Sequence, residues 1–234
     1  MATPTAAHAA KPGALVRALG TLLPGVATTG RQITDFSIEW QRRNDRSLAT
    51  DGPLWVALGD SLAQGIGASS VDAGYVARLQ EVARLRELGH HVTNLVNLSV
   101  SGAKIRDVID HQLPRLDELH RSPVLVTCNV GSNDLVRGLG LRSASRGIEE
   151  LIASLPTRTI LATLPDRGSL LAKRLNRQIR RDAEAHGVVV ADVGARLDSW
   201  KGRFAKDGFH PNDAGYGVWV EAFAQAMTEL TLET

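Results

Sequence analysis

The sequence predicts an α/β protein built on a parallel sheet with helices on both faces. Short apolar runs recur between residues 54 and 193, and they lack the polar alternation of strands that face water on one side. Longer segments with apolar residues three and four positions apart separate these runs, as expected for crossover helices. Because crossovers between parallel strands are right-handed, this alternation places helices on both faces of one sheet.

Five strands are expected, and each is a short apolar run. The first, at residues 54–58, ends at Gly59 and is apolar throughout, which is typical of a strand buried on both faces. The others are expected at residues 92–100, 123–130, 159–163 and 188–193. Cys128 is the only cysteine and lies in the third strand, so we expect a buried thiol and no internal disulfide.

Helices are expected wherever apolar residues recur at helical spacing. The predicted segments are residues 32–48, 71–88, 104–119, 141–155, 169–186 and 213–230. Gly89 is the expected C-cap of the second helix. Pro114 lies inside the third helix, where its missing N–H must kink or divide the helix.

Residues 1–50 are expected to form an N-terminal extension that is partly helical and disordered at its start. Residues 14–29 are the only candidate for an export signal or an anchor, but Arg17 and Pro24 interrupt this stretch. It is also shorter than the ~20 apolar residues that a membrane span requires. We therefore expect a cytoplasmic protein without a stable membrane span, with secretion or membrane association left open. The helix at residues 32–48 is part apolar and part basic, which fits packing on the main domain or contact with a membrane surface or a partner.

The composition is that of a soluble protein and leaves the chemistry open. Of the 234 residues, 43% are hydrophobic and 22% are charged, and the net charge of +2 gives no indication of a nucleic-acid partner. Arginine outnumbers lysine by 22 to 5, which fits either a GC-rich genome or the binding of carboxylate or phosphate groups by guanidinium. The seven histidines show no His-x-His spacing, and no metal or other cofactor is expected.

Polar residues suited to nucleophilic catalysis follow the predicted strands. In a parallel sheet, ligands bind outside the carboxyl ends of the strands. Ser61 follows the first strand at the turn into a helix, Gly102 follows the second strand and Asn133 follows the third. The loop after the fifth strand carries Asp207 three residues before His210. We therefore expect these five residues to meet at one edge of the sheet.

Together these residues supply the parts of an acyl-transfer site. Ser61 is the expected nucleophile, His210 the general base and acid, and Asp207 the group that orients the imidazole. The backbone N–H groups of Ser61 and Gly102 and the side-chain amide of Asn133 are the expected donors to the oxyanion. The motifs around Ser61, Gly102, Asn133 and the Asp207–His210 pair are each common alone. The prediction depends on all four occurring in this order at strand ends.

In these four motifs the sequence resembles the SGNH hydrolases, also called GDSL esterases and lipases. The matching segments are Gly59-Asp60-Ser61-Leu62, Asn97-Leu98-Ser99-Val100-Ser101-Gly102, Gly131-Ser132-Asn133-Asp134 and Asp207-Gly208-Phe209-His210. The resemblance implies a flavodoxin-like three-layer α/β/α sandwich, a five-stranded parallel sheet of order 2-1-3-4-5, no metal, and ester or thioester chemistry on Ser61. Residues 51–234 would form the catalytic domain, whereas residues 1–50 lie outside the family pattern.

Two loops beside these motifs are expected to border the substrate, unless both are simply solvated. They follow Asn133 and the fourth strand. The side chains expected to contact substrate are Arg137, Leu139, Arg142, Arg167 and Leu170. The arginines suit an anionic or sugar-like part of the substrate, and the leucines suit an acyl chain.

Three functions fit this pattern. The leading one is a serine acyl hydrolase that acts on esters or thioesters of short or medium acyl chains. The second is an acyltransferase that moves the acyl group onto a sugar or glycerate-type hydroxyl, since its chemistry is identical up to the acyl-enzyme. The third is a non-catalytic flavodoxin-like binding module. The expected partner is a small-molecule acyl ester or thioester, with a carbohydrate acceptor in the case of transfer, and the sequence leaves the oligomeric state open.

Overall fold

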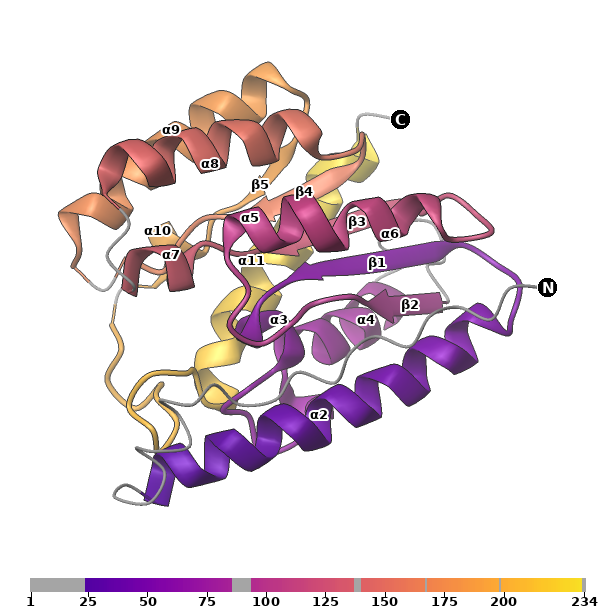
Figure 1. Ribbon diagram of the computed structural model, residues 1–234, viewed down its shortest axis with the longest axis horizontal. Coiled ribbons are helices and arrows are strands. Elements are labelled where there is room, and N and C mark those ends of the chain that lie inside the picture. The colour runs from indigo at the N-terminus through magenta and orange to yellow at the C-terminus, as the bar shows by residue number, and fades with distance from the viewer. Residues whose placement is uncertain (1–23, 86–93, 137–139, 167, 198, 233–234) are drawn as a thin grey trace.

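A five-stranded parallel sheet forms the centre of the protein, shown in a computed structural model that describes residues 24–85, 94–136, 140–166, 168–197 and 199–232 (Figure 1). The strand order is β2-β1-β3-β4-β5, and every neighbouring pair is parallel. The strands are β1 (Leu54–Gly59), β2 (Asn94–Asn97), β3 (Leu125–Asn129), β4 (Thr159–Ala162) and β5 (Val189–Ala191). The predicted α/β class and the sheet order 2-1-3-4-5 are confirmed.

The helical segments alternate with these strands. They are α2 (Pro24–Leu48), α3 (Ser61–Gln64), η1 (Val71–Ala73), α4 (Tyr75–Leu85), α5 (Ile105–Asp107), η2 (Val108–Gln112), α6 (Pro114–Asp117), α7 (Ser132–Val136), α8 (Leu141–Ser154), α9 (Leu170–Ala185), α10 (Val193–Arg196) and α11 (Asp213–Leu232). The predicted division at Pro114 is confirmed, because α6 begins at this residue. The short helices α7 and α10 were not predicted.

The prediction of one helix over residues 71–88 is wrong at its start. The chain forms the 3₁₀ turn η1, and α4 begins only after Gly74. A Cβ at Gly74 would lie 2.8 Å from the Cα of Gly65, so this junction packs directly on the chain that follows α3. The predicted cap at Gly89 lies outside the described residues.

The second strand ends three residues earlier than predicted. The Asn97 side chain turns back at the end of β2, and its Oδ1 accepts hydrogen bonds from the backbone N–H and the hydroxyl of Ser99, at 3.0 and 2.5 Å. This local turn competes with continued strand pairing. It directs the following residues, up to Gly102, along the carboxyl edge of the sheet.

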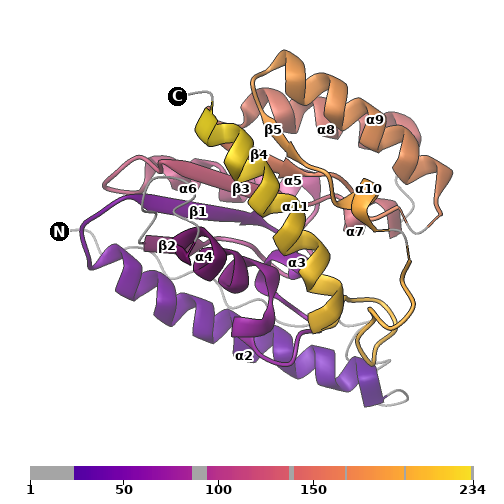
Figure 2. The ribbon, with the colours of Figure 1, turned by 180° about the vertical axis from the view of Figure 1, so that it is seen from behind.

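Two hydrophobic clusters cover the two faces of the sheet. One cluster joins β-strand side chains to apolar residues of α2, α4 and α11, including the fully buried Tyr75 and Trp219. The other joins them to α8 and α9 through residues such as Ile148 and Ile179. Figure 2 shows α4 and α11 in front of the sheet, on the face opposite the one seen in Figure 1. The three layers place the carboxyl ends of β1 and β3 at one open edge.

Helix α2 packs on the domain beside β2 (Figure 1). Its apolar residues Ile33, Phe36 and Trp40 belong to the first cluster. The Asn44 side chain makes two 2.8 Å hydrogen bonds to the backbone of Asn97 and so occupies part of the open edge of β2. Of the two roles considered for this helix, packing is the one that the structure shows. No helix within the described ranges combines the length and apolar character needed to cross a membrane.

Candidate active site

The end of β1 is shaped to present Ser61. Gly59 has a φ of +141°, and a Cβ there would lie 2.2 Å from the Asn129 carbonyl oxygen, so only glycine fits. The Gln112 side chain pairs with both the N–H and the carbonyl of Gly59 at 2.8 Å. Asp60 then caps α3 with its carboxyl group, and Ser61 is the first residue of that helix. The position of Ser61, the predicted nucleophile, is therefore fixed by a buried strand end and a helix cap.

The structure brings Ser61, His210 and Asp207 into one chain of hydrogen bonds. Ser61 Oγ lies 3.0 Å from His210 Nε2, and His210 Nδ1 lies 2.7 Å from Asp207 Oδ2. Ser61 and His210 are buried, with 7% and 8% of their surfaces exposed. This geometry allows the imidazole to remove a proton from the hydroxyl while the carboxylate holds the other ring nitrogen.

The Asp207 carboxylate is held in its ionised form. Its Oδ1 accepts from the backbone N–H groups of Phe209 and His210, and its Oδ2 also accepts from the Thr29 hydroxyl at 2.7 Å. Burial alone would raise the pKa of Asp207, but the hydrogen bonds and the charge of His210 outweigh it, so the pKa lies well below its ordinary value. An acceptor-only carboxylate at this position selects the imidazole tautomer with a proton on Nδ1.

Gly67 makes room for the imidazole. It has a φ of +97°, and a Cβ there would lie 2.7 Å from the Cβ of His210 and 2.5 Å from the Pro211 carbonyl oxygen. The Gly65-Ile66-Gly67 segment has some likeness to a phosphate loop in sequence. In the structure, its last glycine instead contacts the loop that carries Asp207 and His210, called the histidine loop below.

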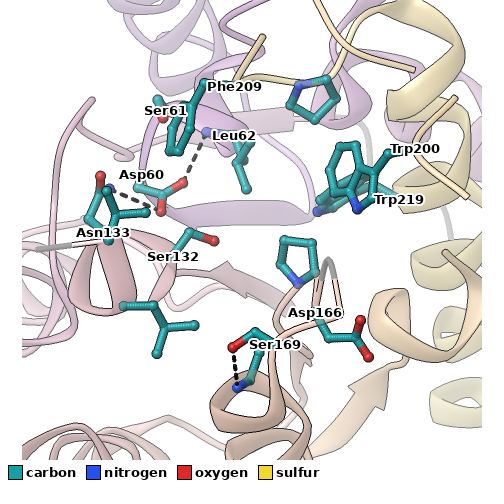
Figure 3. A pocket seen from close by; sticks show the side chains of 15 residues that line it. Asp60, Ser61, Leu62, Ser132, Asn133, Asp166, Ser169, Trp200, Phe209 and Trp219 are labelled. Atoms are coloured by element: carbon teal, nitrogen blue, oxygen red, sulfur yellow. Dashed lines mark hydrogen bonds between the residues drawn. The ribbon is translucent and has the colours of Figure 1, made fainter. Parts of the chain in front are cut away.

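Of the expected oxyanion donors, Asn133 lines the same cavity as Ser61. Gly102 has a φ of +85° and open space where a side chain would be, so a ligand can approach its backbone closely. The Asn133 side chain lies beside Asp60, and its Nδ2 donates to the Ala103 carbonyl at 3.0 Å and to Asp60 Oδ2 at 3.3 Å (Figure 3). One of these two hydrogen bonds must open before Asn133 can donate to an oxyanion.

Asp60 is a buried carboxyl group with an unusual protonation equilibrium. Burial raises its pKa to about 7, and the nearby Asp134 carboxylate adds to this effect, while a hydrogen bond from Leu62 N–H opposes it. Burial therefore favours the protonated form of Asp60, the partner of Asn133. A protonated Asp60 has one fewer acceptor site, which loosens its hold on the Asn133 amide.

A largely apolar cavity of about 190 Å³ opens beside Ser61 (Figure 3). It is lined by Asp60, Ser61, Leu62, Ser132, Asn133, Leu135, Val136, Pro165, Asp166, Ser169, Ala172, Trp200, Phe209, Pro211 and Trp219. The lining comes from α3, α7, the β4–α9 connection and the histidine loop, with the two indoles on the side of α11. An apolar cavity next to a nucleophilic hydroxyl suits the hydrocarbon part of an ester.

Comparison with known proteins agrees with this geometry. Residues 57–218 match the model of the GDSL-like lipase/acylhydrolase family, which is more than half of the chain. The chain belongs to this family. As a GDSL-like acylhydrolase, it is an esterase or hydrolase in the general sense of the family, with its substrate unspecified.

Solved structures of similar fold cover most of this GDSL-like protein. A family 3 carbohydrate esterase of Clostridium thermocellum is 17% identical with a TM-score of 0.64 over 77% of this chain and 98% of that one. TesA is 21% identical with a TM-score of 0.63, and the coverage is 76% and 99%. LAE5, an alpha/beta hydrolase enzyme from the metagenome of Lake Arreo in Spain, is 26% identical with a TM-score of 0.58, and the coverage is 79% and 99%. None of the curated proteins compared matches the sequence.

The residues predicted to contact substrate are only partly placed. Arg137, Leu139 and Arg167 lie outside the described residues. Arg142 is exposed on α8, and Leu170 is 83% exposed at the start of α9. Neither is among the residues that line the cavity beside Ser61, whereas Ser169 and Ala172 of the same region are.

The sequence did not identify three side chains of this site. In the sequence, Trp200 and Trp219 fit core or rim packing, but in the structure they also line the cavity. Their position relative to Ser61 depends on how α11 crosses the sheet, which no local pattern encodes. Thr29 lies in the segment outside the family motifs, and only the packing of α2 brings it to Asp207. In the described part of the chain, no group of three or more His, Cys, Asp or Glu side chains is placed to hold a metal ion.

Proposed function

We propose that the protein is a serine esterase that hydrolyses short or medium acyl esters or thioesters through an acyl-enzyme on Ser61. One observation carries the proposal: the continuous hydrogen-bonded chain from Ser61 Oγ through His210 to Asp207, with heavy-atom distances of 3.0 and 2.7 Å. A buried Ser-His-Asp arrangement next to an apolar cavity suits attack on an acyl carbon.

In the first half-reaction, Ser61 Oγ attacks the acyl carbon while His210 Nε2 takes the hydroxyl proton. The carbonyl oxygen becomes an oxyanion, toward which Ser61 N–H, Gly102 N–H and the Asn133 amide donate hydrogen bonds. When the tetrahedral intermediate collapses, the bond to the leaving oxygen or sulfur breaks. The His210 imidazolium protonates the leaving group, and the acyl group remains on Ser61 as an ester.

In the second half-reaction, water takes the place of the released alcohol or thiol. His210 removes a proton from this water, which attacks the acyl-enzyme, and the proton returns to Ser61 Oγ as the carboxylic acid leaves. Asp207 stays ionised throughout, in agreement with its lowered pKa. The cavity of about 190 Å³ would hold the acyl chain, and its apolar lining favours hydrocarbon over charged acyl groups.

Covalent labelling with a fluorophosphonate tests the proposal. We expect the wild-type protein to be labelled on Ser61 and the Ser61→Ala variant to be unlabelled and inactive toward p-nitrophenyl acyl esters. Absence of labelling in the folded wild type would refute a serine-based mechanism. Product analysis with a thioester donor, with and without a sugar acceptor, then distinguishes free acid as the product from an acylated sugar.

A further inference from the structure

We propose that Thr29 is a positioning residue that holds the Asp207–His210 pair in register with Ser61, an inference that rests on the proposed function. Thr29 lies on α2, outside residues 57–218, which match the family. It is 8% exposed, and its Oγ1 lies 2.7 Å from Asp207 Oδ2, across 178 positions of sequence. Because an ionised carboxylate only accepts hydrogen bonds, the Thr29 hydroxyl is the donor.

The other donors to the Asp207 carboxylate come from its own loop. They are the backbone N–H groups of Phe209 and His210 and the imidazole Nδ1–H. These groups follow Asp207 wherever the loop moves, so they fix the shape of the loop but not its place in the protein. Among the described residues that donate to this carboxylate, Thr29 alone belongs to another element, and that element is a 25-residue helix packed into the core.

The same helix also holds the nucleophile side of the site. Trp40 Nε1 donates to the carbonyl of Gln64, the last residue of α3, at 3.0 Å. The Gln32 side chain accepts from Gly67 N–H at 3.1 Å and donates to the Ala68 carbonyl at 2.8 Å. Helix α2 therefore bonds both to the segment that carries Ser61 and to the carboxylate that orients His210. In this way the helix holds Ser61 and His210, which lie 149 positions apart in the sequence, at a fixed distance from each other.

The proposal makes a kinetic prediction. Without the Thr29 hydroxyl, the Asp207 carboxylate gains freedom to turn, and the imidazole it holds spends less time aligned with Ser61 Oγ. This alignment matters in the transition state and not for ground-state binding, so kcat should fall while KM changes little.

The test compares Thr29→Val, which keeps the shape but removes the hydroxyl, with Thr29→Ser, which retains it. Rates are expressed per active site titrated with a fluorophosphonate, so that unfolded protein does not count. We expect Thr29→Val to lower kcat about 10- to 100-fold, as for the loss of a hydrogen bond to a charged group, with KM within about twofold. Thr29→Ser should restore kcat to within about threefold of wild type. Arg42→Gln, which removes an exposed ion pair with Glu39 on the same helix, should leave kcat unchanged.

An unchanged kcat per titrated site in Thr29→Val would overturn the inference, even if the variant were less stable. A fall in kcat in Thr29→Val that Thr29→Ser shares equally would also overturn it, since both variants would then act by altering packing. A wild-type protein that no fluorophosphonate labels would instead refute the proposed function. The two failures are therefore distinguishable in one set of measurements.

Discussion

The Asn133 side chain donates hydrogen bonds to Asp60 Oδ2 and to the Ala103 carbonyl, and this occupies both of its amide protons. The bond to Asp60 is the longer one, at 3.3 Å. It is therefore the one that an oxyanion would most readily replace. We expect the amide to shift its donor from Asp60 to the substrate oxygen as charge develops there.

Removal of this amide should slow the chemistry more than it weakens binding. We expect Asn133→Ala to lower kcat about 10²- to 10³-fold, the usual effect of losing one oxyanion donor. Gln178→Ala removes another side-chain amide, one that binds Ser145 on the helix surface, and should keep wild-type kcat. Steady-state kinetics with p-nitrophenyl esters measure both. A kcat within threefold of wild type in Asn133→Ala would exclude Asn133 as an oxyanion donor.

Loss of the Asp207 carboxylate should affect both kcat and the stability of the fold at low pH. Asp207→Asn preserves the shape but favours the wrong imidazole tautomer, so we expect kcat to fall up to about 10⁴-fold in a folded protein. The native pKa of Asp207 is lower than its unfolded value of about 3.9, so the ionised group stabilises the fold above that pH. This contribution is lost as the pH falls through the native pKa.

Urea unfolding at several pH values tests the acid-stability part. The stability advantage of wild type over Asp207→Asn should be largest near neutrality and should shrink below about pH 4. An advantage that stayed constant on acidification would show that the carboxylate is not held in its ionised form.

Asp60 should show the opposite pH dependence. Its native pKa is about 7, above the unfolded value, so the folded protein keeps a proton that the unfolded chain has lost. The contribution of Asp60 to stability therefore decreases as the pH rises from about 4 to about 7. The unfolding free energy of Asp60→Asn relative to wild type should increase over this interval, measured by urea unfolding at pH 5 and pH 8. A relative stability that stayed the same between pH 5 and pH 8 would mean that Asp60 is already ionised in the fold.

Gly67→Ala should disturb His210 more than it disturbs the fold. The added Cβ would lie 2.7 Å from the His210 Cβ and 2.5 Å from the Pro211 carbonyl, and the positive φ costs about 1–2 kcal/mol for a non-glycine residue. We expect kcat per titrated site to fall by at least about tenfold, since misalignment of a catalytic base is costly. Gly202→Ala carries similar backbone strain, at φ +73°, with open space around its Cβ. It should lower the melting temperature but keep kcat.

A bulky residue at the mouth of the cavity should change the preferred acyl length. Val136 lines the cavity and is 65% exposed, so Val136→Trp can be accommodated without repacking the core. We expect kcat/KM for a hexanoyl ester to fall about tenfold or more relative to an acetyl ester. Val124→Trp, at an exposed position that is not part of the cavity lining, should keep the wild-type ratio. An unchanged ratio in Val136→Trp would argue that the acyl chain lies elsewhere.

The sequence was most informative where function depends on the order of strands. Ser61, Gly102 and Asn133 each follow a strand, so a parallel sheet alone brings them to one edge. Asp207 and His210 could be paired because three residues separate them. The role of Gly67 in seating the imidazole could not be inferred, because glycine patterns give no indication of what approaches them.

Contacts between elements that lie far apart in the sequence could not be predicted from the sequence. Thr29 has no local pattern that indicates a catalytic neighbour, since its contact with Asp207 exists only when α2 and the histidine loop have both docked. Trp200 and Trp219 satisfy the pattern of buried aromatic residues equally well in a core and beside a cavity. The break at Gly74 arises from its close approach to Gly65, a contact between two turns.

The separation of Ser61 from His210 by 149 positions has a consequence for biosynthesis. Ser61 leaves the ribosome before His210, its proposed base, which is encoded after the last strand of the sheet. A nascent chain therefore carries an unactivated hydroxyl until His210 has been translated and the nonlocal contacts have formed. Phosphonate labelling of Ser61 during synthesis or refolding would then report the completion of folding from a single side chain.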